Sequence, residues 1–239
     1  MDVRLADIPL LILAGGRATR LGTLSEDLPK FLMPIGEQKR FADVQLAWAH
    51  AQGFRRIVLS VGYRGELIEQ YCQNGDRWQL SISYAKDGDR PLGTAGAVKR
   101  AFADPPPCAC VLYGDTILEL DCVAAVRRLE TPGAVAVMTV LADPPAGHRP
   151  NADFDGTRVL YAKKTPDPSW RYIDYGFLVL SDRFLREVSA DVPLDLAEPL
   201  EIAARAGRLA GMAATVPFCE INTPEALNAF RDRFTPWLK

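Results

Sequence analysis

Strand-like and helix-like segments alternate through the first 130 residues, and this alternation constrains the fold more than any other feature of the chain. Short apolar runs predict strands, and periodic segments that stop at glycine, asparagine or proline predict helices. The predicted strands are 8–13, 56–62, 80–85 and 109–114, and the predicted helices are 41–52, 64–73, 94–103 and 119–130. Repeated strand–helix–strand units favour an α/β fold around a mostly parallel sheet. Thr94 is expected to cap its helix.

The second half of the chain alternates less regularly. Strands are predicted at 134–141, 158–162, 173–180 and 209–216, helices at 182–189 and 195–206, and loops at 143–153 and 165–171. Thr223-Pro224-Glu225 is typical of a helix start, because threonine caps, proline fits the first turn and glutamate favours the positive end of the helix dipole. No linker, repeat or low-complexity tract divides the sequence, so one domain over residues 1–239 is expected.

The composition excludes several classes of function. The 239 residues are 48% apolar, which is enough for a large core, and they carry a formal net charge of −2. A general nucleic-acid binder needs a broad basic surface, so no nucleic-acid partner is expected and any anion site must be local. Five cysteines without C-x-x-C spacing and only two histidines argue against a zinc site and fit a reducing compartment. With no signal-peptide pattern and no apolar stretch of ~18 residues, a cytoplasmic protein without a membrane partner is expected.

A glycine-rich loop follows the first predicted strand. Gly15 and Gly16 come directly after the apolar run, where glycine allows a sharp turn or a close approach to a ligand. Arg20 and Lys30 follow in the stretch 14-AGGRATRLGTLSEDLPKFLMPIG-36 and add positive charge, so the loop and these cations together predict an anion site. The pattern is neither a P-loop nor a dinucleotide fingerprint. A plain surface turn is the alternative for the glycines alone.

An acidic residue is expected at the same edge of the sheet as this loop. Asp115 follows the fourth predicted strand and Gly114, and ligands in such sheets bind beyond the carboxyl ends of the strands. A carboxylate there is suited to a metal ion, and a turn-forming aspartate is the alternative. The stretch 87-DGD-89 has the spacing of a metal-binding D-x-D motif, but it lies in a polar segment and we interpret it as a turn. Gln45 and Trp48 lie on a helical pattern and are interpreted as structural.

A series of ordered motifs resembles the sugar-1-phosphate nucleotidyltransferases, also called nucleotide-sugar pyrophosphorylases. The first loop matches their G-G-x-G-T-R-L signature at Gly15, Gly16, Thr19, Arg20 and Leu21. The other matches are Pro29-Lys30, PLGTAGAV at 91–98, YGDT at 113–116, YIDYGF at 172–177 and FCEINTPEAL at 218–227. Ala18 stands where a third glycine is common, Glu220 where an aspartate is usual and Asn222 where a glycine is usual.

The resemblance implies a Rossmann-like (GT-A-like) three-layer fold with a central mixed, mostly parallel sheet. It also implies nucleotidyl transfer: an oxygen of a sugar 1-phosphate attacks the α-phosphorus of a nucleoside triphosphate and releases pyrophosphate, with Mg²⁺ as cofactor. Residues up to about 133 would bind the nucleotide, residues 134–215 the sugar phosphate, and residues 216–239 would close the domain. Both reactants are polyanions, so the site must supply cations and hold the reactants in register.

The resemblance assigns roles to single residues. It implies catalytic roles for Arg20 and Lys30, and nucleotide binding by Leu13, Ala14, Gly15, Gly16, Thr19, Arg20 and Gly93. It implies sugar-phosphate binding by Lys163, Asp174 and Gly114, and metal binding by Asp115 and Glu220. Lys163 is preferred to Lys164, with a solvated lysine pair at a strand end as the alternative. Asp174 suits a sugar because a carboxylate accepts two hydrogen bonds from a vicinal diol, and an exposed strand residue is the alternative.

The short chain and the YIDYG segment look most like the bacterial branch that acts on D-glycero-D-manno-heptose 1-phosphate or mannose 1-phosphate with GTP. A nucleoside triphosphate and a sugar 1-phosphate are therefore the expected partners, and a homo-oligomer is one possibility. A uridylyl- or thymidylyltransferase acting on another sugar 1-phosphate is the nearest alternative. A non-catalytic nucleotide-sugar-sensing protein is the second, since the motifs depart from the family at several positions. These positions are Ala18, Tyr113, Glu220 and Asn222. A glycosyltransferase using 87-DGD-89 is the third.

Overall fold

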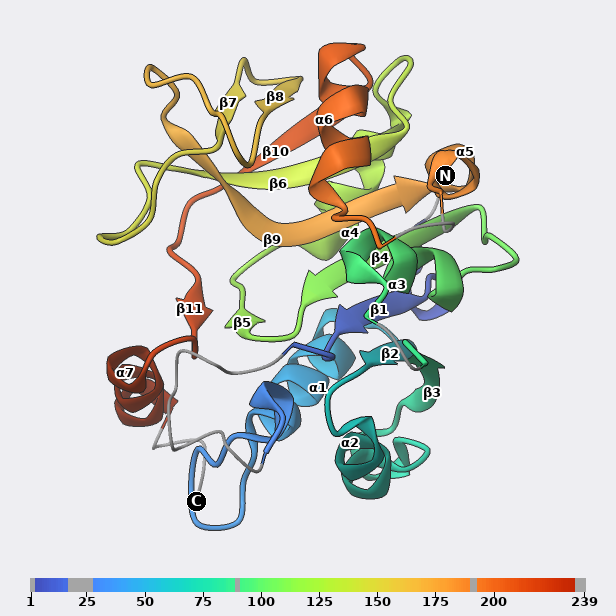
Figure 1. Cartoon of the computed structure of the whole chain (residues 1–239), viewed down its shortest axis with the longest axis vertical. Coiled ribbons are helices and arrows are strands. Elements are labelled where there is room, and N and C mark those ends of the chain that lie inside the picture. The colour runs from blue at the N-terminus through green and yellow to red at the C-terminus, as the bar shows by residue number, and fades with distance from the viewer. Residues whose placement is uncertain (1–2, 17–27, 89–90, 190–192, 235–239) are drawn as a thin grey trace.

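The computed structural model describes residues 3–16, 28–88, 91–189 and 193–234 (Figure 1). Its strands are β1 (Leu10–Leu13), β2 (Arg56–Val61), β3 (Ser81–Lys86), β4 (Cys108–Tyr113), β5 (Thr116–Ile117), β6 (Ala136–Ala142), β7 (Ala152–Phe154), β8 (Val159–Tyr161), β9 (Tyr172–Ser181), β10 (Leu209–Ala214) and β11 (Cys219–Glu220). Its helices are α1 (Phe41–Gln52), α2 (Gly65–Cys72), α3 (Gly93–Ala101), α4 (Cys122–Arg127), α5 (Asp182–Glu187), α6 (Ala197–Arg205) and α7 (Pro224–Phe234). The predicted elements are present in the predicted order. None of the described helices has the length and apolar run that a membrane crossing requires.

The central sheet is mixed and mostly parallel, as predicted. Its main path runs β10-β6-β9-β4-β1-β2-β3. Within it, β1 is parallel to both β2 and β4, β2 is parallel to β3, and β6 is parallel to β10. The long strand β9 is antiparallel to both of its neighbours, β4 and β6. The chain thus places β2 and β3 on one side of β1 and then crosses to lay β4 on the other side.

This crossing defines where a ligand can bind. In an open α/β sheet, the loops that leave two neighbouring parallel strands in opposite directions open a crevice beyond their carboxyl ends. Here the two strands are β1 and β4, whose last residues Leu13 and Tyr113 are paired in register. The glycine-rich loop after β1 and the turn with Asp115 after β4 therefore leave the sheet side by side.

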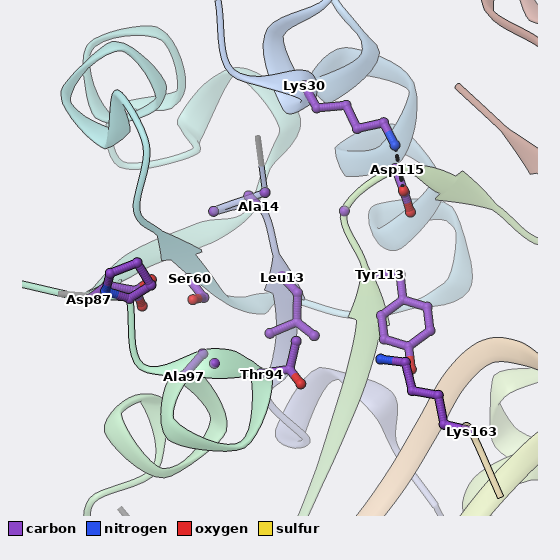
Figure 2. Close-up of a pocket in the computed structure, with 15 residues that line it drawn as sticks. Leu13, Ala14, Lys30, Ser60, Asp87, Thr94, Ala97, Tyr113, Asp115 and Lys163 are labelled. Atoms are coloured by element: carbon purple, nitrogen blue, oxygen red, sulfur yellow. Dashed lines mark hydrogen bonds and ion pairs between the residues drawn. The ribbon is translucent and has the colours of Figure 1, made fainter. Parts of the chain in front are cut away.

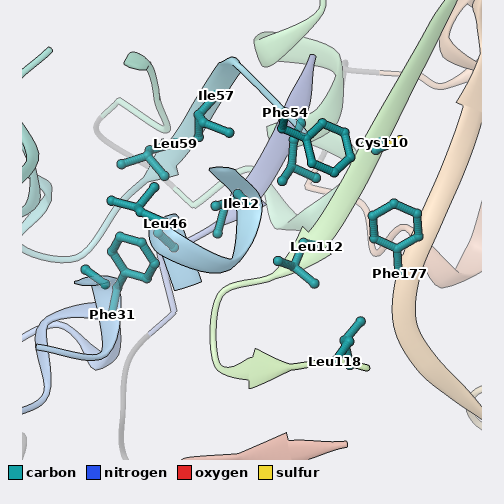
Figure 3. Packing of buried hydrophobic residues seen from close by; sticks show 14 of the residues in the cluster. Ile12, Phe31, Leu46, Phe54, Ile57, Leu59, Cys110, Leu112, Leu118 and Phe177 are labelled. Carbon is teal, nitrogen blue, oxygen red and sulfur yellow. The ribbon is translucent and has the colours of Figure 1, made fainter. Parts of the chain in front are cut away.

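Helices cover both faces of the sheet, which gives the three layers that the sequence predicts. Successive residues of a strand point to opposite faces, so Leu10 and Ile12 pack with α1, α2, α4 and α7, whereas Leu11 packs with α3, α5 and α6. All three leucine and isoleucine side chains are fully buried. Figure 3 shows the first of these faces, where Ile12 lies between Leu46 of α1 and Leu112 of β4. A rigid layer on each side fixes the positions of the strand ends.

The strand β9 carries the second half of the fold. A register shift at Met138/Val140 interrupts its pairing with β6, and Figure 1 shows β9 curving across the molecule. The hairpin of β7 and β8 joins the sheet at the start of β9, where Ala152 pairs with Tyr172. A separate pair, β5 and β11, connects the turn after β4 to the C-terminal segment. The strand β9, the β7–β8 hairpin and the β5–β11 pair thus lie next to the crevice at the ends of β1 and β4.

Several local predictions need correction. Thr94 does not cap its helix: α3 begins at Gly93 after Leu92, which makes no side-chain cap. The Thr94 hydroxyl instead donates to Asp195 Oδ1 at 3.2 Å and accepts from the backbone N–H of Leu196 at 2.7 Å. Both of its hydrogen bonds are therefore made to the segment that leads into α6. The helix predicted at 119–130 begins only at Cys122, because residues 116–117 form β5.

Other corrections concern short elements and caps. The loop predicted at 143–153 ends in the strand β7, and the sequence analysis also missed β11. The predicted cap of α7 is confirmed, since Thr223 Oγ1 accepts from the backbone N–H of Ala226 at 3.1 Å. The missed strands β5, β7 and β11 have only two or three residues each, which is too few for a periodic pattern to show in the sequence.

Candidate active site

A cavity of about 510 Å³ opens beyond the ends of β1 and β4, a volume within the range typical of small-molecule sites. Strand ends, the start of α3 and two lysines form its walls (Figure 2). Its described lining is Leu13, Ala14, Gly15, Gly16, Lys30, Ser60, Asp87, Pro91, Gly93, Thr94, Ala97, Tyr113, Gly114, Asp115 and Lys163. We refer to it as the first cavity. The crevice expected from the strand order is therefore present as a real hollow.

Lys30 and Asp115 meet in this cavity although 85 positions separate them in the sequence. The Lys30 ammonium donates to Asp115 Oδ2 at 2.7 Å (Figure 2). The lysine side chain is 12% exposed and the aspartate side chain 29% exposed, so neither charge lies in bulk water. Among the described residues, Asp115 is the acceptor for Lys30, which leaves two N–H bonds of the ammonium for an anion. The pair places a cation and a carboxylate at one end of the cavity.

The turn that carries Asp115 is held from α1. The side-chain amide of Gln45 is buried and donates to the carbonyl oxygens of Tyr113 at 2.8 Å and Thr116 at 2.7 Å. Gly114 lets this turn lie against β1, because a Cβ there would be 2.4 Å from the carbonyl oxygen of Leu13. Gln45 is thus structural, as predicted, and it fixes the backbone on both sides of Asp115.

A second cavity of about 360 Å³ adjoins the first. Its described lining is Tyr113, Asp115, Thr116, His148, Asn151, Tyr161, Lys163, Ile173, Asp174, Tyr175, Gly176, Phe218, Glu220 and Asn222. Tyr113, Asp115 and Lys163 line both cavities. Two hollows that share three polar side chains can hold two different molecules with their reactive ends close together.

Asp174 lies in the wall of the second cavity rather than on an exposed strand face. Its carboxylate accepts from the Tyr113 hydroxyl at 2.8 Å and from the backbone N–H of Gly176 at 3.0 Å. Asn151 Oδ1 accepts from the backbone N–H of Asp174 at 2.9 Å, which directs the amide group of Asn151 away from that contact. Burial raises the pKa of Asp174, and the hydrogen bonds from Gly176 and Tyr113 oppose the rise.

Lys163 is held by Asp195 at the junction of the cavities. Its ammonium lies 2.5 Å from Asp195 Oδ2, while Asp195 Oδ1 accepts from Thr94 and from the backbone N–H of Ala197. Burial acts to raise the pKa of Asp195, but the hydrogen bonds from Lys163 and Ala197 bring it below its ordinary value. Lys164, in contrast, has a side chain that is 79% exposed and pairs loosely with Glu198 at 3.9 Å. Lys163 is therefore the lysine that reaches the cavities.

Glu220 lies at the other side of the second cavity, on β11. This strand pairs with β5 so that Glu220 is opposite Thr116, and the backbone N–H of Ile221 donates to the carbonyl oxygen of Asp115 at 3.1 Å. The two carboxylates thus come from adjacent backbones. Glu220 Oε1 is also 2.9 Å from Nε2 of His148, which packs edge-on against Phe218. In the described part of the chain, no group of three acidic, histidine or cysteine side chains is arranged around a metal position.

The structure thus brings many of the predicted site residues together. Leu13, Ala14, Gly15, Gly16, Lys30, Gly93, Gly114 and Asp115 line the first cavity, and Asp115, Lys163, Asp174 and Glu220 line the second. Gly114, predicted with the sugar phosphate, lies on the first cavity only. Thr19 and Arg20 lie outside the described residues. Sequence reasoning missed Asp87, whose D-G-D context was interpreted as a turn, and the loop residues His148 and Asn151, for which no local signal exists.

A family model described as Nucleotidyl transferase matches residues 10–148, which is more than half of the chain. The chain belongs to the nucleotidyl transferase family. The matched stretch runs from β1 beyond β6, so it contains the glycine-rich loop, Lys30 and Asp115. The family assignment therefore rests on the part of the chain that forms most of the first cavity.

Curated relatives in this family act on different sugars and nucleotides. The UTP–glucose-1-phosphate uridylyltransferase of Synechocystis sp. is 31% identical over 139 residues, covering 54% of this chain and 36% of that protein. The D-glycero-alpha-D-manno-heptose 1-phosphate guanylyltransferase of Campylobacter jejuni is 34% identical over 111 residues, covering 46% of this chain and 49% of that protein. The chain thus spans about half the length, or less, of these curated relatives.

Two solved structures share the fold over nearly the whole chain. HddC from Yersinia pseudotuberculosis superposes with a TM-score of 0.78 at 23% identity, covering 95% of this chain and 99% of that chain. A second structure of HddC, complexed with GMP-PN, superposes with a TM-score of 0.76 at 23% identity and the same coverage. At this identity the likeness shows the fold alone, and it confirms the Rossmann-like architecture.

Proposed function

We propose that this protein transfers a nucleotidyl group from a nucleoside triphosphate, with GTP favoured, to a heptose- or mannose-type sugar 1-phosphate. The products are a nucleotide sugar and pyrophosphate. The observation that carries the proposal is the pair of adjoining cavities that share Tyr113, Asp115 and Lys163. A two-substrate displacement needs this arrangement, because the attacking oxygen and the α-phosphorus must meet in line.

The charges at the junction suit two phosphorylated reactants. Two unit charges about 4 Å apart repel by about 4 kcal/mol at an effective dielectric constant near 20, and several such pairs form when a triphosphate meets a sugar phosphate. Positive side chains reduce this repulsion: Lys30 lines the first cavity, and Lys163 lines both cavities. In the proposed reaction, Lys30 binds the triphosphate and Lys163 binds the phosphate of the sugar. Arg20, expected to assist Lys30, remains a prediction.

The residues present fit a hard divalent cation. Asp115 and Glu220 offer carboxylate oxygens, the donors that Mg²⁺ prefers, and the backbone bond between Ile221 and Asp115 keeps their strands adjacent. We infer that these two residues would hold Mg²⁺ together with substrate phosphates. When bound there, the ion would neutralise charge that develops on phosphate oxygens. Glutamate in place of aspartate adds one methylene, and Glu220 Oε1 lies 2.9 Å from Nε2 of His148.

The division of labour along the chain follows the cavities. Apart from Lys163, the described lining of the first cavity comes from residues 13–115, which agrees with a nucleotide-binding part up to about residue 133. The lining of the second comes from residues 113–222, in line with a sugar-phosphate part over about 134–215 and a closing segment from 216. GTP is favoured because the sequence resembles guanylyltransferases, and relatives of that name are among those matched. A cytoplasmic location and a homo-oligomer stay predictions.

Pyrophosphate release tests the proposal. The purified protein is incubated with Mg²⁺, each of GTP, UTP, dTTP and ATP, and a panel containing heptose, mannose and glucose 1-phosphates. We expect release to require both a triphosphate and a sugar 1-phosphate, with GTP and a manno-configured sugar giving the highest kcat/KM. Exclusive turnover of UTP or dTTP would replace guanylyl transfer by the alternative transferase. Binding of a triphosphate without release from any pair would favour a nucleotide-sensing protein.

A further inference from the structure

Gln45 is a buried amide that belongs to α1 and lines neither cavity. Its side chain is fully buried next to Leu46, a member of the apolar core. Both of its N–H donors are used on one turn of the chain, because Nε2 donates to the carbonyl oxygens of Tyr113 at 2.8 Å and Thr116 at 2.7 Å. These two residues flank Gly114 and Asp115, so a helix outside the cavities holds the backbone that carries the shared carboxylate.

The amide of Gln45 also carries a cost to the folded state. Its Oε1 is buried and has no hydrogen-bond partner in the part of the chain that the structure describes. A buried acceptor without a donor is destabilising, whereas an apolar side chain of similar volume would leave no polar atom unpaired. Local departures of this kind from a fully satisfied core are expected at functional sites. We therefore looked for the role of Gln45 in the turn that its two N–H groups hold.

The carbonyl groups of this turn are held from two different sides. The carbonyl oxygen of Asp115 accepts from the backbone N–H of Ile221 at 3.1 Å, across the β5–β11 pair. Successive carbonyl groups of a strand point in opposite directions, so the carbonyl of Thr116 points away from β11 and accepts from Gln45 instead. The strand β11 thus holds the turn from one side, and α1 holds it from the other.

The two sets of hydrogen bonds fix the positions of two carboxylates at once. Asp115 lies between the two carbonyl groups that Gln45 holds, and Glu220 is opposite Thr116 in the β5–β11 pair. With its backbone fixed, the Asp115 side chain has only two torsions left, and its carboxylate lies 2.7 Å from the Lys30 ammonium. A small displacement of the turn would change the distance from Asp115 to Lys30, and from both carboxylates to an ion held between them.

We propose that Gln45 is a positioning residue for the transfer reaction. Its two amide donors set the place of the Asp115 carboxylate, and through it the affinity for a divalent cation and the rate of nucleotidyl transfer. This inference rests on the proposed function, including metal binding by Asp115 and Glu220. Because Gln45 lines neither cavity, its loss should lower metal affinity and kcat and leave the KM values of both substrates nearly unchanged.

The test uses side chains of similar length that supply two, one or no donors. Glutamine supplies two N–H groups, glutamate that burial keeps protonated supplies one O–H group, and methionine supplies none. The dissociation constant of Mn²⁺, added alone, is measured by electron paramagnetic resonance, and kcat is measured by pyrophosphate release with the best substrate pair. We expect Gln45→Met to weaken Mn²⁺ binding on the order of 10-fold and to lower kcat on the order of 10- to 100-fold. Gln45→Glu should lie between Gln45→Met and wild type in both measurements.

Stability should follow a different order from metal affinity and kcat. Methionine removes the unpaired Oε1 and fills a similar volume, whereas glutamate must give up its charge to be buried. The midpoint of urea unfolding should therefore fall more in Gln45→Glu than in Gln45→Met. Losses of stability, Mn²⁺ affinity and kcat that all follow one order would show a purely structural role and overturn the inference. If Gln45→Met does not fold, Gln45→Glu alone decides, because a wild-type Mn²⁺ affinity in that variant would also overturn it.

Further variants show whether the effect passes through Asp115. In an Asp115→Asn background, Gln45→Met should cause no further loss of Mn²⁺ affinity, because the carboxylate that Gln45 positions is no longer there. Equal losses with and without that carboxylate would contradict the inference. Gln52→Met changes the last residue of the same helix, and Asp104→Asn changes an exposed aspartate after α3. Both controls should keep the wild-type Mn²⁺ affinity and kcat.

The inference and the proposed function fail in distinguishable ways. Wild-type Mn²⁺ affinity and kcat in both Gln45 variants would overturn the positioning role and leave nucleotidyl transfer intact. A graded loss of Mn²⁺ affinity, without pyrophosphate release from any substrate pair in wild type, would support the positioning role and overturn the transferase. Failure of Mn²⁺ to bind wild type would overturn the metal site and the positioning role together, and pyrophosphate release would still test the transfer.

Discussion

The two cavities are built from different kinds of parts. The first is lined largely by strand ends and backbone, with residues 13–16 at the end of β1 and residues 113–115 at the end of β4 meeting where the strand order reverses. The second is lined by side chains of β9, of the segments flanking the β7–β8 hairpin and of the segment around β11. The first cavity follows from the order of the parallel strands, whereas the second depends on contacts between segments that are far apart in the sequence.

Because the two linings differ, substitutions in each cavity can change different ligand preferences. A backbone-lined crevice recognises phosphate by N–H groups and fixed cations, and this requirement is the same for every nucleoside triphosphate. A wall of amide, imidazole and carboxylate side chains can change its hydrogen-bonding pattern with single substitutions. We therefore expect changes at Asp115, which lines both cavities, to affect both substrates, changes at Lys30 to affect the triphosphate, and changes confined to the second cavity to affect the sugar 1-phosphate.

The largest expected effect comes from the carboxylate that both cavities share. Asp115→Asn keeps the shape of the side chain but removes the charge that would bind Mg²⁺ and that pairs with Lys30. We expect kcat to fall on the order of 10²- to 10³-fold in a protein that still folds. The measurement is pyrophosphate release with the best substrate pair. Asp104→Asn is the matched control, and near-normal turnover in Asp115→Asn would remove Asp115 from the metal-binding role.

A smaller loss is expected from the cation of the first cavity. Lys30→Ala removes a charge-assisted hydrogen bond to the triphosphate, so kcat/KM for GTP should fall on the order of 10- to 100-fold. The KM of the sugar 1-phosphate should change little. Lys39→Ala, at an exposed lysine nearby in the sequence, serves as control. An equal rise of both KM values would show that Lys30 organises the whole site rather than the triphosphate side.

The sequence predicts the first cavity better than the second because its parts are local. Gly15, Gly16 and Lys30 belong to one continuous motif, and the rule that parallel strands share a carboxyl edge adds Asp115 to them. The same local reasoning fails at Thr94, whose hydroxyl is taken by a residue 101 positions away. It also fails at Asp87, because D-G-D is equally good turn chemistry whether or not a cavity lies beside it.

The second cavity depends on contacts that no local pattern contains. The partnership of His148 with Glu220 joins a loop to a two-residue strand, and neither segment has enough periodicity to reveal its position. The predicted roles of Lys163 and Asp174 came from motif order rather than from residue spacing. The structure adds the polar contacts that the sequence cannot supply, such as the Tyr113 hydroxyl on Asp174.

The close contact of the backbones at the ends of β1 and β4 can be tested by measuring the stability of glycine variants. Gly114→Ala places a Cβ 2.4 Å from the carbonyl oxygen of Leu13, and neither backbone can move without disturbing the sheet. We expect the free energy of unfolding to fall by about 1–3 kcal/mol in a denaturant titration. Gly16→Ala is the matched variant, since no described atom lies within 4 Å of its Cβ position, and it should be near neutral. Equal stability of the two variants would show that the β1–β4 edge yields to a methyl group.

The smallest effect in this series tests whether the second cavity acts on the sugar 1-phosphate alone. Asp195→Asn keeps the acceptor for Thr94 but removes the negative charge that holds the Lys163 ammonium at 2.5 Å. Lys163 then loses its fixed position, so the KM of the sugar 1-phosphate should rise by about 3- to 10-fold while kcat/KM for GTP stays constant. The role of Asp195 is exerted through Lys163, which makes a double-mutant cycle decisive. In a Lys163→Ala background, Asp195→Asn should have no further effect on the sugar 1-phosphate. Additive losses would mean that Asp195 acts through Thr94 and the start of α3, and the two cavities would then be coupled rather than independent.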